Sequence, residues 1–469
     1  MKNIIDRFFF KTILEKSKVL PIESHDVQEF QQGKNFFYQL KKKSYIRLHA
    51  ELNKILEKIE LNNSSVAFRK NTSYLNLFEP HRKNYYFLRL DIRSFFHSIQ
   101  IKDIKKIFQP YMEGDIWFMK YNNYYDYDGE LVVDGFINLV TYQVPKNSKN
   151  IKFQGKKILP MGFKTSPIIS NIIFRQLDIQ IQKLCESHEI VYTRYADDML
   201  FSSSKKSAFI HSETFTKEIR IIIGQMNFKL NEHKTLKAKH TLSLNGYTIQ
   251  YENNFKIMNN QTKTREFYGV VKDLNSQKIE TRIINEFRLS NKKINIIKKI
   301  IYMINIEKKS SDLIMKKLYN INYKKEKNSE KKNYEQLLYK ILGYRSYLLS
   351  IVQFDKKYHC TQKETIEKYI KIINDLEKIA EKYQKEIDKL EKIIEKKRKS
   401  LKNMSKILIG NLPLIDSQKK NLKKANFKTL KDFYELTEKD LIDKVKGVGE
   451  VNAKNIMEVI RKELKKYRK

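Results

Sequence analysis

The stretch RYADDMLFSSS, residues 194–204, sets two adjacent carboxylates, Asp197 and Asp198, between short apolar runs. The surrounding segment 190–203 is rich in Tyr, Val and Leu, which are typical of β-strands. A second apolar segment, YYFLRLDI (85–92), is also predicted to be a strand, and Asp91 lies at its end. Carboxylates that converge from two strands can hold a pair of divalent cations about 3.5–4 Å apart. An aspartate pair alone is weak support, because tight turns often carry Asp.

The charge of the chain points to a polyanionic partner. It has 93 Lys and Arg against 54 Asp and Glu, which gives a formal net charge of +39. An AT-rich genome would explain many lysines, but not why acidic residues are so much rarer. Nucleic acid is the usual partner, because its phosphates attract Lys and Arg. The 469 residues, 41% of them hydrophobic, are enough for a folded protein of two to four domains.

The cysteines and the apolar runs bear on the cellular compartment. Cys185 and Cys360 are the only cysteines, so we expect neither a zinc-site spacing nor a disulfide framework. The N-terminus lacks the uninterrupted apolar core of a signal peptide. No run of 18 apolar residues occurs, so no membrane span is expected. We therefore predict a cytoplasmic protein.

Hydrophobic spacing divides the chain into five predicted regions. The first is helical, with Leu48, Leu52, Ile55 and Ile59 at helical spacing. The second mixes strands with helices and holds most of the candidate chemistry. A basic helical region follows, then a long charged helix, and then a small helical domain. The predicted boundaries are 1–60, 61–254, 255–360, 361–404 and 405–469.

The long charged helix has heptad spacing. Its apolar residues follow a 3-4 pattern that Lys397 interrupts once: Leu376, Ala380, Tyr383, Ile387, Leu390, Ile394 and Leu401. This pattern predicts a coiled coil and, through it, a homo-oligomer. The alternative is one long helix that lies on the protein's own body.

Several motifs together resemble the reverse transcriptase family. YADD (195–198), flanked by strands, looks like the family's palm signature, and LDIRSFFHSI (90–99) resembles its first catalytic motif. LPMGFKTSPIISN (159–171) is similar to the motif usually written LPQGxxTSPxxSN. The fingers segment and two later palm motifs are matched by AFRKNTSY (67–74), LNEHKT (230–235) and LSLNGYTI (242–249). The resemblance implies an α+β right-hand polymerase fold with fingers, palm and a helical thumb.

The resemblance also implies catalytic roles for four positions. Asp91, Asp197 and Asp198 would hold two Mg²⁺ ions, with Mn²⁺ as an alternative, because Mg²⁺ prefers hard oxygen ligands. One ion would lower the pKa of a primer 3′-hydroxyl, and the other would hold the triphosphate. Lys234 would help to protonate the leaving pyrophosphate, although a solvated lysine is the simpler alternative.

The incoming dNTP would meet a second set of residues. Arg69 and Lys70 would neutralise the triphosphate, and Gly162 would let the backbone approach the nucleotide closely. Phe96 takes the family's sugar-gate position, where a ring clashes with a ribose 2′-hydroxyl. Ordinary surface cations and simple core packing remain the alternatives for these side chains.

Primer and template contacts are expected at two places. Tyr195 precedes the aspartate pair and would pack near the primer end. The segment LLYKILGYRSYLLSI (337–351) resembles the family's thumb helix, in which Arg345 would follow the template–primer backbone. A packed amphipathic helix is the structural alternative.

Departures from the family narrow the subgroup. Met161 replaces a Gln that would contact the nucleotide. Leu244-Asn245-Gly246 stands where retron enzymes carry VTG, and no NAxxH box is found between 100 and 158. Ser166-Pro167 replaces the SQ of diversity-generating enzymes, and no HNH-like cluster of intron enzymes is found. By elimination, the chain is most similar to defence-associated and abortive-infection reverse transcriptases.

The last 60 residues resemble a helix-hairpin-helix domain. In DKVKGVGEVNAKNIMEVI (443–460), Gly447 and Gly449 would form a tight turn whose N–H groups hold a phosphate. The wider stretch is similar to the C-terminal domain of the RNA polymerase α-subunit. That domain's DNA-contacting arginine aligns with Ser417, which weakens the case for duplex binding. A small domain for protein contacts is the alternative.

The sequence therefore predicts an RNA-directed DNA polymerase that uses dNTPs and makes cDNA from a small structured noncoding RNA, in anti-phage defence. A retron-type enzyme that makes branched RNA–DNA is the alternative within the same class. A nucleic-acid-binding scaffold that no longer polymerises is the alternative from another class. The intact set of carboxylates argues against the scaffold, because unneeded buried carboxylates are costly.

Overall fold

The computed structural model describes residues 21–33, 35–112, 132–251, 286–321 and 329–467. The chain divides into two compact units. The first comprises Met1–Lys292 with Ser350–Glu367, and the second comprises Lys293–Leu349 with Lys368–Lys469. The predicted start of the thumb at residue 255 lies outside the described residues.

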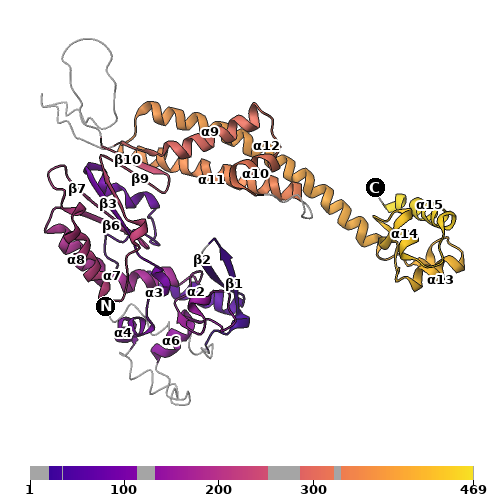
Figure 1. Cartoon of the computed structure of the whole chain (residues 1–469), viewed down its shortest axis with the longest axis horizontal. Helices are drawn as coiled ribbons and strands as arrows, with labels where there is room; N and C mark the ends of the chain where they lie inside the picture. The colour runs from indigo at the N-terminus through magenta and orange to yellow at the C-terminus, as the bar shows by residue number, and fades with distance from the viewer. Residues whose placement is uncertain (1–20, 34, 113–131, 252–285, 322–328, 468–469) are drawn as a thin grey trace, which may run out of the picture. The chain divides into compact units, whose positions relative to one another are not determined.

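The first unit is built on a four-stranded antiparallel sheet. Its strand order is β6-β7-β3-β8, so the strands expected from the two aspartate segments lie side by side (Figure 1). Leu88, Leu90, Met199 and Phe201 are fully buried and anchor this sheet in the core. The bounds are β3 (Tyr86–Asp91), β6 (Val191–Tyr195), β7 (Asp198–Ser203) and β8 (Leu236–Lys239).

Helices cover this sheet and join it to the N-terminal part of the unit. Helix α7 contacts β6 and α8, and its buried side chains belong to the same core as the sheet. The helices are α3 (Phe95–Ser98), α4 (Ile101–Met112), α6 (Val132–Val140), α7 (Ser166–Glu186) and α8 (Glu213–Gly224). Short 3₁₀ turns are η1 (Ser24–Asp26), η2 (Tyr74–Leu77), η3 (Glu79–Lys83), η5 (Ile151–Phe153), η6 (Phe209–His211) and η7 (Glu232–Lys234).

Two smaller sheets complete the first unit. One is a three-stranded antiparallel sheet with the order β11-β10-β9, and the other pairs β4 with β5. Their bounds are β4 (Tyr142–Gln143), β5 (Lys157–Ile158), β9 (Thr241–Leu244), β10 (Tyr247–Gln250) and β11 (Glu286–Leu289).

The N-terminal region is not wholly helical, so that prediction is wrong for residues 27–40. They form an antiparallel hairpin of β1 (Val27–Gln32) and β2 (Asn35–Leu40), and only α2 (Lys43–Leu56) matches the predicted helix. Phe30 and Phe37 are directly opposite, and their rings stack 5.5 Å apart. Such cross-strand aromatic pairs stabilise a hairpin, and the helical spacing of residues 48–59 carries no information about this local pairing.

The second unit contains most of an antiparallel pair of long helices, α11 (Ser329–Tyr358) and α12 (Lys363–Met404); residues 350–358 and 363–367 of these helices belong to the first unit. Tyr334 and Tyr383 pack with ring centroids 5.3 Å apart. Lys331 pairs with Glu391 at 2.7 Å, and Glu377 pairs with an arginine of α11. As the residue numbers of the contacts increase along α11, those of their partners on α12 decrease. The two helices therefore run in opposite directions.

These contacts cover much of the heptad seam. Leu376, Tyr383 and Ile387 are buried, whereas residues 388–399 are mostly exposed. The structure therefore supports the alternative of a helix that lies on the chain's own body over the first part of α12. Helices α9 (Asn291–Asn305) and α10 (Ser311–Tyr319) belong largely to the same unit. Within the described ranges, no helix is both long and apolar enough to cross a bilayer.

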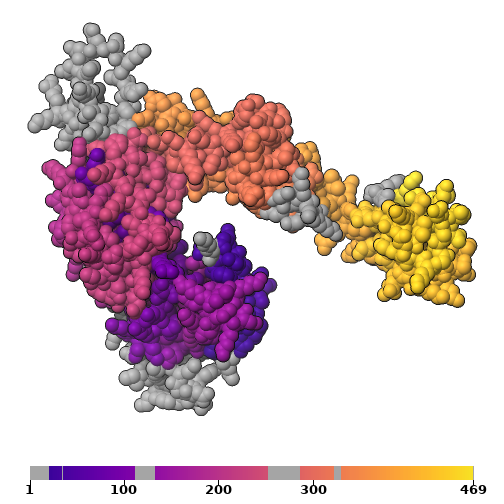
Figure 2. Space-filling view, viewed as in Figure 1, coloured from indigo at the N-terminus to yellow at the C-terminus, as the bar shows by residue number. Residues whose placement is uncertain are grey.

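The C-terminal residues form a small all-helical body with its own core (yellow in Figure 2). Phe433, Leu441, Ile456 and Ile460 lie at the centre of this core, and Met404 at the end of α12 joins it. The elements are η8 (Ile409–Asn411), α13 (Asp416–Lys424), η9 (Leu430–Phe433), α14 (Glu438–Lys444) and α15 (Glu450–Tyr467).

Candidate active site

The three predicted carboxylates meet where β3 ends and β7 begins, at one end of the two central strands of the β6-β7-β3-β8 sheet. We call this place the carboxylate edge. Asp91 ends β3 and lies directly opposite Asp198, the first residue of β7. Directly opposite residues point to the same face of an antiparallel pair. Asp197 lies in the tight turn between β6 and β7, and its carbonyl accepts a 2.9 Å hydrogen bond from the N–H of Ile92. The backbone thus ties the aspartate turn to the end of β3.

Two cations neutralise this edge. Arg89 lies two residues before Asp91 on the same strand face, and its Nε donates to Asp198 at 2.8 Å. The Nη2 of Arg89 also donates to both Asp91 and Asp198. Lys234 donates to Asp91 at 2.9 Å, as does the side-chain amide of Asn231. Lys234 therefore contacts Asp91 in this structure, and its role towards the pyrophosphate stays a prediction.

Asp197 is the carboxylate with the perturbed acidity. Its pKa is raised from an ordinary value of 3.8 to about 6, chiefly by burial and then by the neighbouring charges of Asp198 and Asp91. A hydrogen bond from backbone N–H and the nearby Lys234 oppose this rise. Like charges thus meet in a poorly solvated place, where a bound cation would stabilise them.

The metal-free chain should be more stable when Asp197 is replaced by Asn. Because the folded-state pKa lies above the ordinary value, Asp197 favours folding below about pH 4, and this contribution is lost as pH rises through about 6. At pH 7.5 the Asp197→Asn chain should therefore unfold with a free energy about 1–3 kcal/mol higher than wild type. The gain should vanish at pH 4. Urea unfolding at the two pH values, with a metal chelator present, measures both; an equal difference at pH 4 and pH 7.5 would contradict the assignment.

A buried arginine links the turn that carries Asp197 to helix α7. Arg194 is 0% exposed, and its Nη1 donates to the carbonyl of Ala196 at 2.9 Å, inside the turn. Its Nη2 pairs with Asp178 of α7 at 2.7 Å, and Nη1 also donates to the side chain of Asn171. Tyr192 donates to the same Asp178 at 2.7 Å. The turn that carries Asp197 is therefore fastened to helix α7.

An aromatic group lies beside the carboxylates. The ring of Tyr195 lies 4.8 Å from that of Tyr74 and 6.0 Å from that of Phe68, and Phe68 lies 6.4 Å from Phe96. Phe68 is 40% exposed and has a φ of +58°, which is strained for a bulky residue. Phe96 is half-buried. The predicted primer residue and the predicted sugar gate thus border the same ring cluster.

Arg69 and Lys70 are engaged elsewhere in this structure. Arg69 donates to the carbonyls of Asn62 at 3.2 Å and Ser65 at 3.1 Å. Lys70 pairs with Glu57 at 2.8 Å while remaining largely exposed. Their contact with a triphosphate stays a prediction, and it requires at least Lys70 to exchange its partner.

The structure explains the glycine at position 162 by its packing against Tyr38, not by the predicted approach to a nucleotide. Its φ is +115°, and a Cβ there would lie 2.6 Å from the carbonyl oxygen of Tyr38. The neighbouring Met161 carbonyl accepts a 2.8 Å hydrogen bond from the N–H of Tyr38. The glycine therefore allows close approach of the N-terminal hairpin. Nucleotide contact by Met161 and Gly162 stays a prediction.

The remaining predicted site residues lie in the second unit. Arg345 pairs with Glu377 at 2.6 Å. Gly447 has a φ of +84° in the turn between α14 and α15, and Gly449 directly precedes α15. A turn thus joins two helices at this place, whereas the helix-hairpin-helix and its phosphate binding stay predictions.

Four residues at the site were missed by the sequence prediction. Arg89 could have been found, because a charge two residues before Asp91 must share its strand face. Arg194 is a lone charge in an apolar strand, which also signals a buried partner. Asn231 and Asn245 carry no such signal. Asn245 lies in the β9–β10 turn and reaches Asp198 at 3.5 Å and Tyr74 at 2.5 Å.

The site offers carboxylate oxygens, which are the type of ligand that a hard divalent cation prefers. Asp91, Asp197 and Asp198 supply carboxylate oxygens from two strands and a turn, which Mg²⁺ prefers. In the described part of the chain, no three acidic, His or Cys side chains gather tightly enough to enclose an ion as they stand. Arg89 and Lys234 contact these carboxylates instead, so cation binding there would have to displace or share their hydrogen bonds.

Comparisons with known proteins point to polymerases. Residues 40–271 match the family described as reverse transcriptase (RNA-dependent DNA polymerase). The chain is 31% identical over 193 residues to the retron Ec73 reverse transcriptase of Escherichia coli, covering 40% of this chain and 55% of the relative. It is 27% identical over 184 residues to the retron Ec86 reverse transcriptase of Escherichia coli, covering 39% and 48%.

The chain thus spans about half the length of the curated relatives it matches. Among solved structures, apo telomerase from Candida tropicalis covers 52% of this chain and 50% of its own, with 12% identity and a TM-score of 0.31. That score is too low to compare the sites. The match to the reverse transcriptase family covers the part of the chain that carries all three carboxylates.

Proposed function

We propose that the chain is an RNA-directed DNA polymerase that makes cDNA from a small structured noncoding RNA. The observation that carries the proposal is the convergence of Asp91, Asp197 and Asp198 at one sheet edge, inside the region that matches the reverse transcriptase family. The large positive charge of the chain is consistent with RNA and DNA partners.

Two Mg²⁺ ions would supply an activated primer hydroxyl and stabilisation of the leaving pyrophosphate. Asp91 and Asp197 would hold them, with Asp198 beside them. Lys234, which donates to Asp91 in this structure, would move a proton towards the pyrophosphate. The buried Arg194 keeps the turn carbonyl of Ala196 in place, so the aspartates stay oriented while substrates bind and leave.

The biological setting is proposed to be anti-phage defence. The relatives that match are named as retron reverse transcriptases, so the missing VTG triplet and NAxxH box do not exclude a retron. Retron synthesis of branched RNA–DNA therefore remains the second candidate. A noncoding RNA gene beside this one, and branched product, would favour it.

Regions outside the polymerase are proposed to add contacts. The C-terminal body would bind a nucleic-acid phosphate at the Gly447 turn, in the manner of a helix-hairpin-helix. A homo-oligomer through α12 would have to use its exposed part, because the first part of the seam packs on α11.

Primer extension by the purified chain tests the proposal. The mixture contains an RNA template with an annealed primer, dNTPs and Mg²⁺. DNA extended to the template end supports the proposal. Absence of extension with RNA and DNA primers alike, from a chain that still binds the template, would support the scaffold instead.

Replacement of Phe96 by Ala should weaken selection of dNTPs. If the Phe96 ring rejects the ribose 2′-hydroxyl, its removal should lower the preference for dNTPs over rNTPs by roughly tenfold or more. Single-nucleotide incorporation with dGTP and GTP measures the ratio of kcat/KM. Phe96→Tyr keeps the ring and serves as the control; an unchanged ratio in Phe96→Ala would assign the ring to core packing.

A further inference from the structure

The loop that precedes the LPMG segment is strongly basic. Residues 145–157, PKNSKNIKFQGKK, contain five lysines and no Asp or Glu. This lysine loop (145–157) lies largely between β4 and β5, whose pairing brings its two ends together. It also presents Ile151, an apolar side chain that is 80% exposed. Cations interspersed with exposed apolar groups are typical of surfaces that bind single-stranded nucleic acid.

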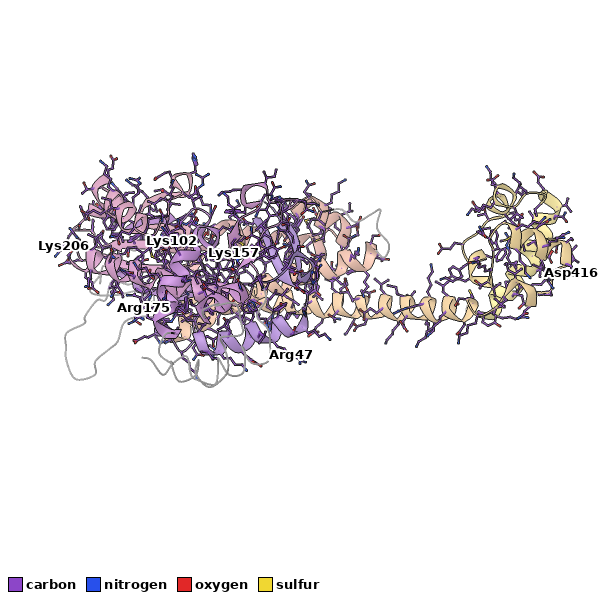
Figure 3. The ribbon with its side chains drawn as sticks, turned by 90° about the horizontal axis from the view of Figure 1, so that it is seen from below. Arg47, Lys102, Lys157, Arg175, Lys206 and Asp416 are labelled. Carbon is purple, nitrogen blue, oxygen red and sulfur yellow. The ribbon has the colours of Figure 1, made fainter. Side chains whose placement is uncertain are left out.

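An open hollow of about 570 Å³ lies between the lysine loop and the segment 97–102, which runs from the end of α3 to the start of α4. His97 and Lys102 line it from that segment, and Phe153, Lys156 and Lys157 line it from the loop. Lys102 and Lys157 are labelled in Figure 3. None of the described side chains that line it is a carboxylate. We call this hollow the lysine groove.

Aromatic rings form one wall of the lysine groove. The centroids of the His97 and Phe153 rings are 4.7 Å apart. Burial, and secondarily Lys152, lowers the pKa of His97 to about 4, so this ring is neutral at pH 7. Its Nε2 is buried and has no hydrogen-bond partner among the described groups.

Cations crowd at the rim of the groove. Lys152 lies 5.0 Å above the Phe153 ring, and its Nζ contacts Ser94 at 3.0 Å. Burial lowers the pKa of Lys152, and the nearby charges of Arg93 and Lys156 lower it further. Two neighbouring acids lie outside the lining: Asp103 follows Lys102 on α4, and Glu29 accepts from Ser148. A polyanion would relieve this repulsion.

We propose that the lysine groove binds a single-stranded segment of nucleic acid, with phosphates on Lys102 and Lys156 and a base against Phe153. A single strand fits better than a duplex, because only an unstacked base can reach a ring inside a hollow. The proposal goes beyond polymerisation, since none of these residues belongs to the carboxylate edge. Template RNA and cDNA product share the chemistry that the groove recognises.

Binding of labelled 15-nucleotide RNA and DNA strands to the full chain, measured by fluorescence polarisation across a salt series, tests the groove. The groove variant is Lys102→Ala with Lys156→Ala. The matched control is Lys183→Ala with Lys206→Ala, which removes the same charge from exposed positions; Figure 3 places Lys206 apart from Lys102 and Lys157. Binding at other basic surfaces is common to both variants and cancels in the comparison.

The groove variant should bind about tenfold more weakly than the control, and its salt slope should fall by about 1.4 for two lost phosphate contacts. Phe153→Leu should weaken binding about tenfold without changing the slope, because stacking carries no charge. Phe153→Tyr, which keeps the ring, should bind like wild type.

Loss of affinity with either strand supports the groove and identifies that strand as its ligand. Equal affinities and slopes for the groove variant and its control, with both strands, would overturn the proposal. So would weaker binding of an oligoglutamate peptide with no change for either strand, which would indicate an acidic protein partner. Because the readout is binding alone, failure of polymerisation would leave this result unaffected.

Discussion

Asp197→Asn should reduce primer extension on an RNA template by at least about a thousandfold, because a two-cation site contributes several kcal/mol and each 1.36 kcal/mol is tenfold in rate. The change is nearly isosteric and removes a charge from a place where Asp91 and Asp198 already repel it. The variant should therefore fold at least as well as wild type while losing activity. A destabilised chain could not give this combination.

Asp134→Asn is the matched control for this loss. Asp134 is a half-exposed carboxylate on α6 that pairs with Lys105 at 2.9 Å. Single-turnover extension with preannealed template and primer measures the chemical step in both variants. Activity of Asp197→Asn within tenfold of the Asp134→Asn control would show that this carboxylate does not hold a catalytic cation.

Arg194→Met should lower the free energy of unfolding by about 3–5 kcal/mol, because it leaves the buried charge of Asp178 without its partner. The Arg194 and Asp178 side chains are both 0% exposed. Arg194 also donates to Ser65 and Asn171, so its loss leaves further buried acceptors unsatisfied. Denaturation by urea measures the change.

The control for Arg194 is another arginine ion pair in the same unit. Arg220 pairs with Glu232 at 2.9 Å, but both side chains are about half exposed. Arg220→Met should change the free energy of unfolding by less than about 1 kcal/mol. The double variant Arg194→Met with Asp178→Leu should recover part of the loss, since no charge is then stranded. Equal effects of Arg194→Met and Arg220→Met would contradict the role of the buried pair.

The strands that carry the aspartates were predictable because their signal is local. Segments 85–92 and 190–203 have β-forming residues, and the structure places strands in both. The β1–β2 hairpin was missed because it depends on cross-strand contacts such as Phe30 with Phe37. The long helix was predicted, but its partner was not, because a heptad does not specify whether another chain or α11 covers it.

The site was predictable to the extent that chemistry dictates residue type. The three carboxylates fit what divalent cations require, whereas Lys234 follows from the resemblance to reverse transcriptases; the structure gathers all four at one edge. The interactions that hold them in place depend on sheet register and on helix packing. Arg194 is bound to α7 by its ion pair with Asp178, and Gly162 leaves room for the backbone of Tyr38 in the N-terminal hairpin. Such long-range partners leave little trace in a single sequence.

The most direct test of polymerase function is sequencing of all nucleic acid that co-purifies with the tagged chain, from phage-infected and uninfected cells. The comparison is with the double variant Asp197→Ala and Asp198→Ala. We expect an RNA in both samples, and DNA complementary to that RNA only with the wild-type chain. The same RNA in both samples, with no DNA in either, would contradict an RNA-directed DNA polymerase and favour a nucleic-acid-binding scaffold.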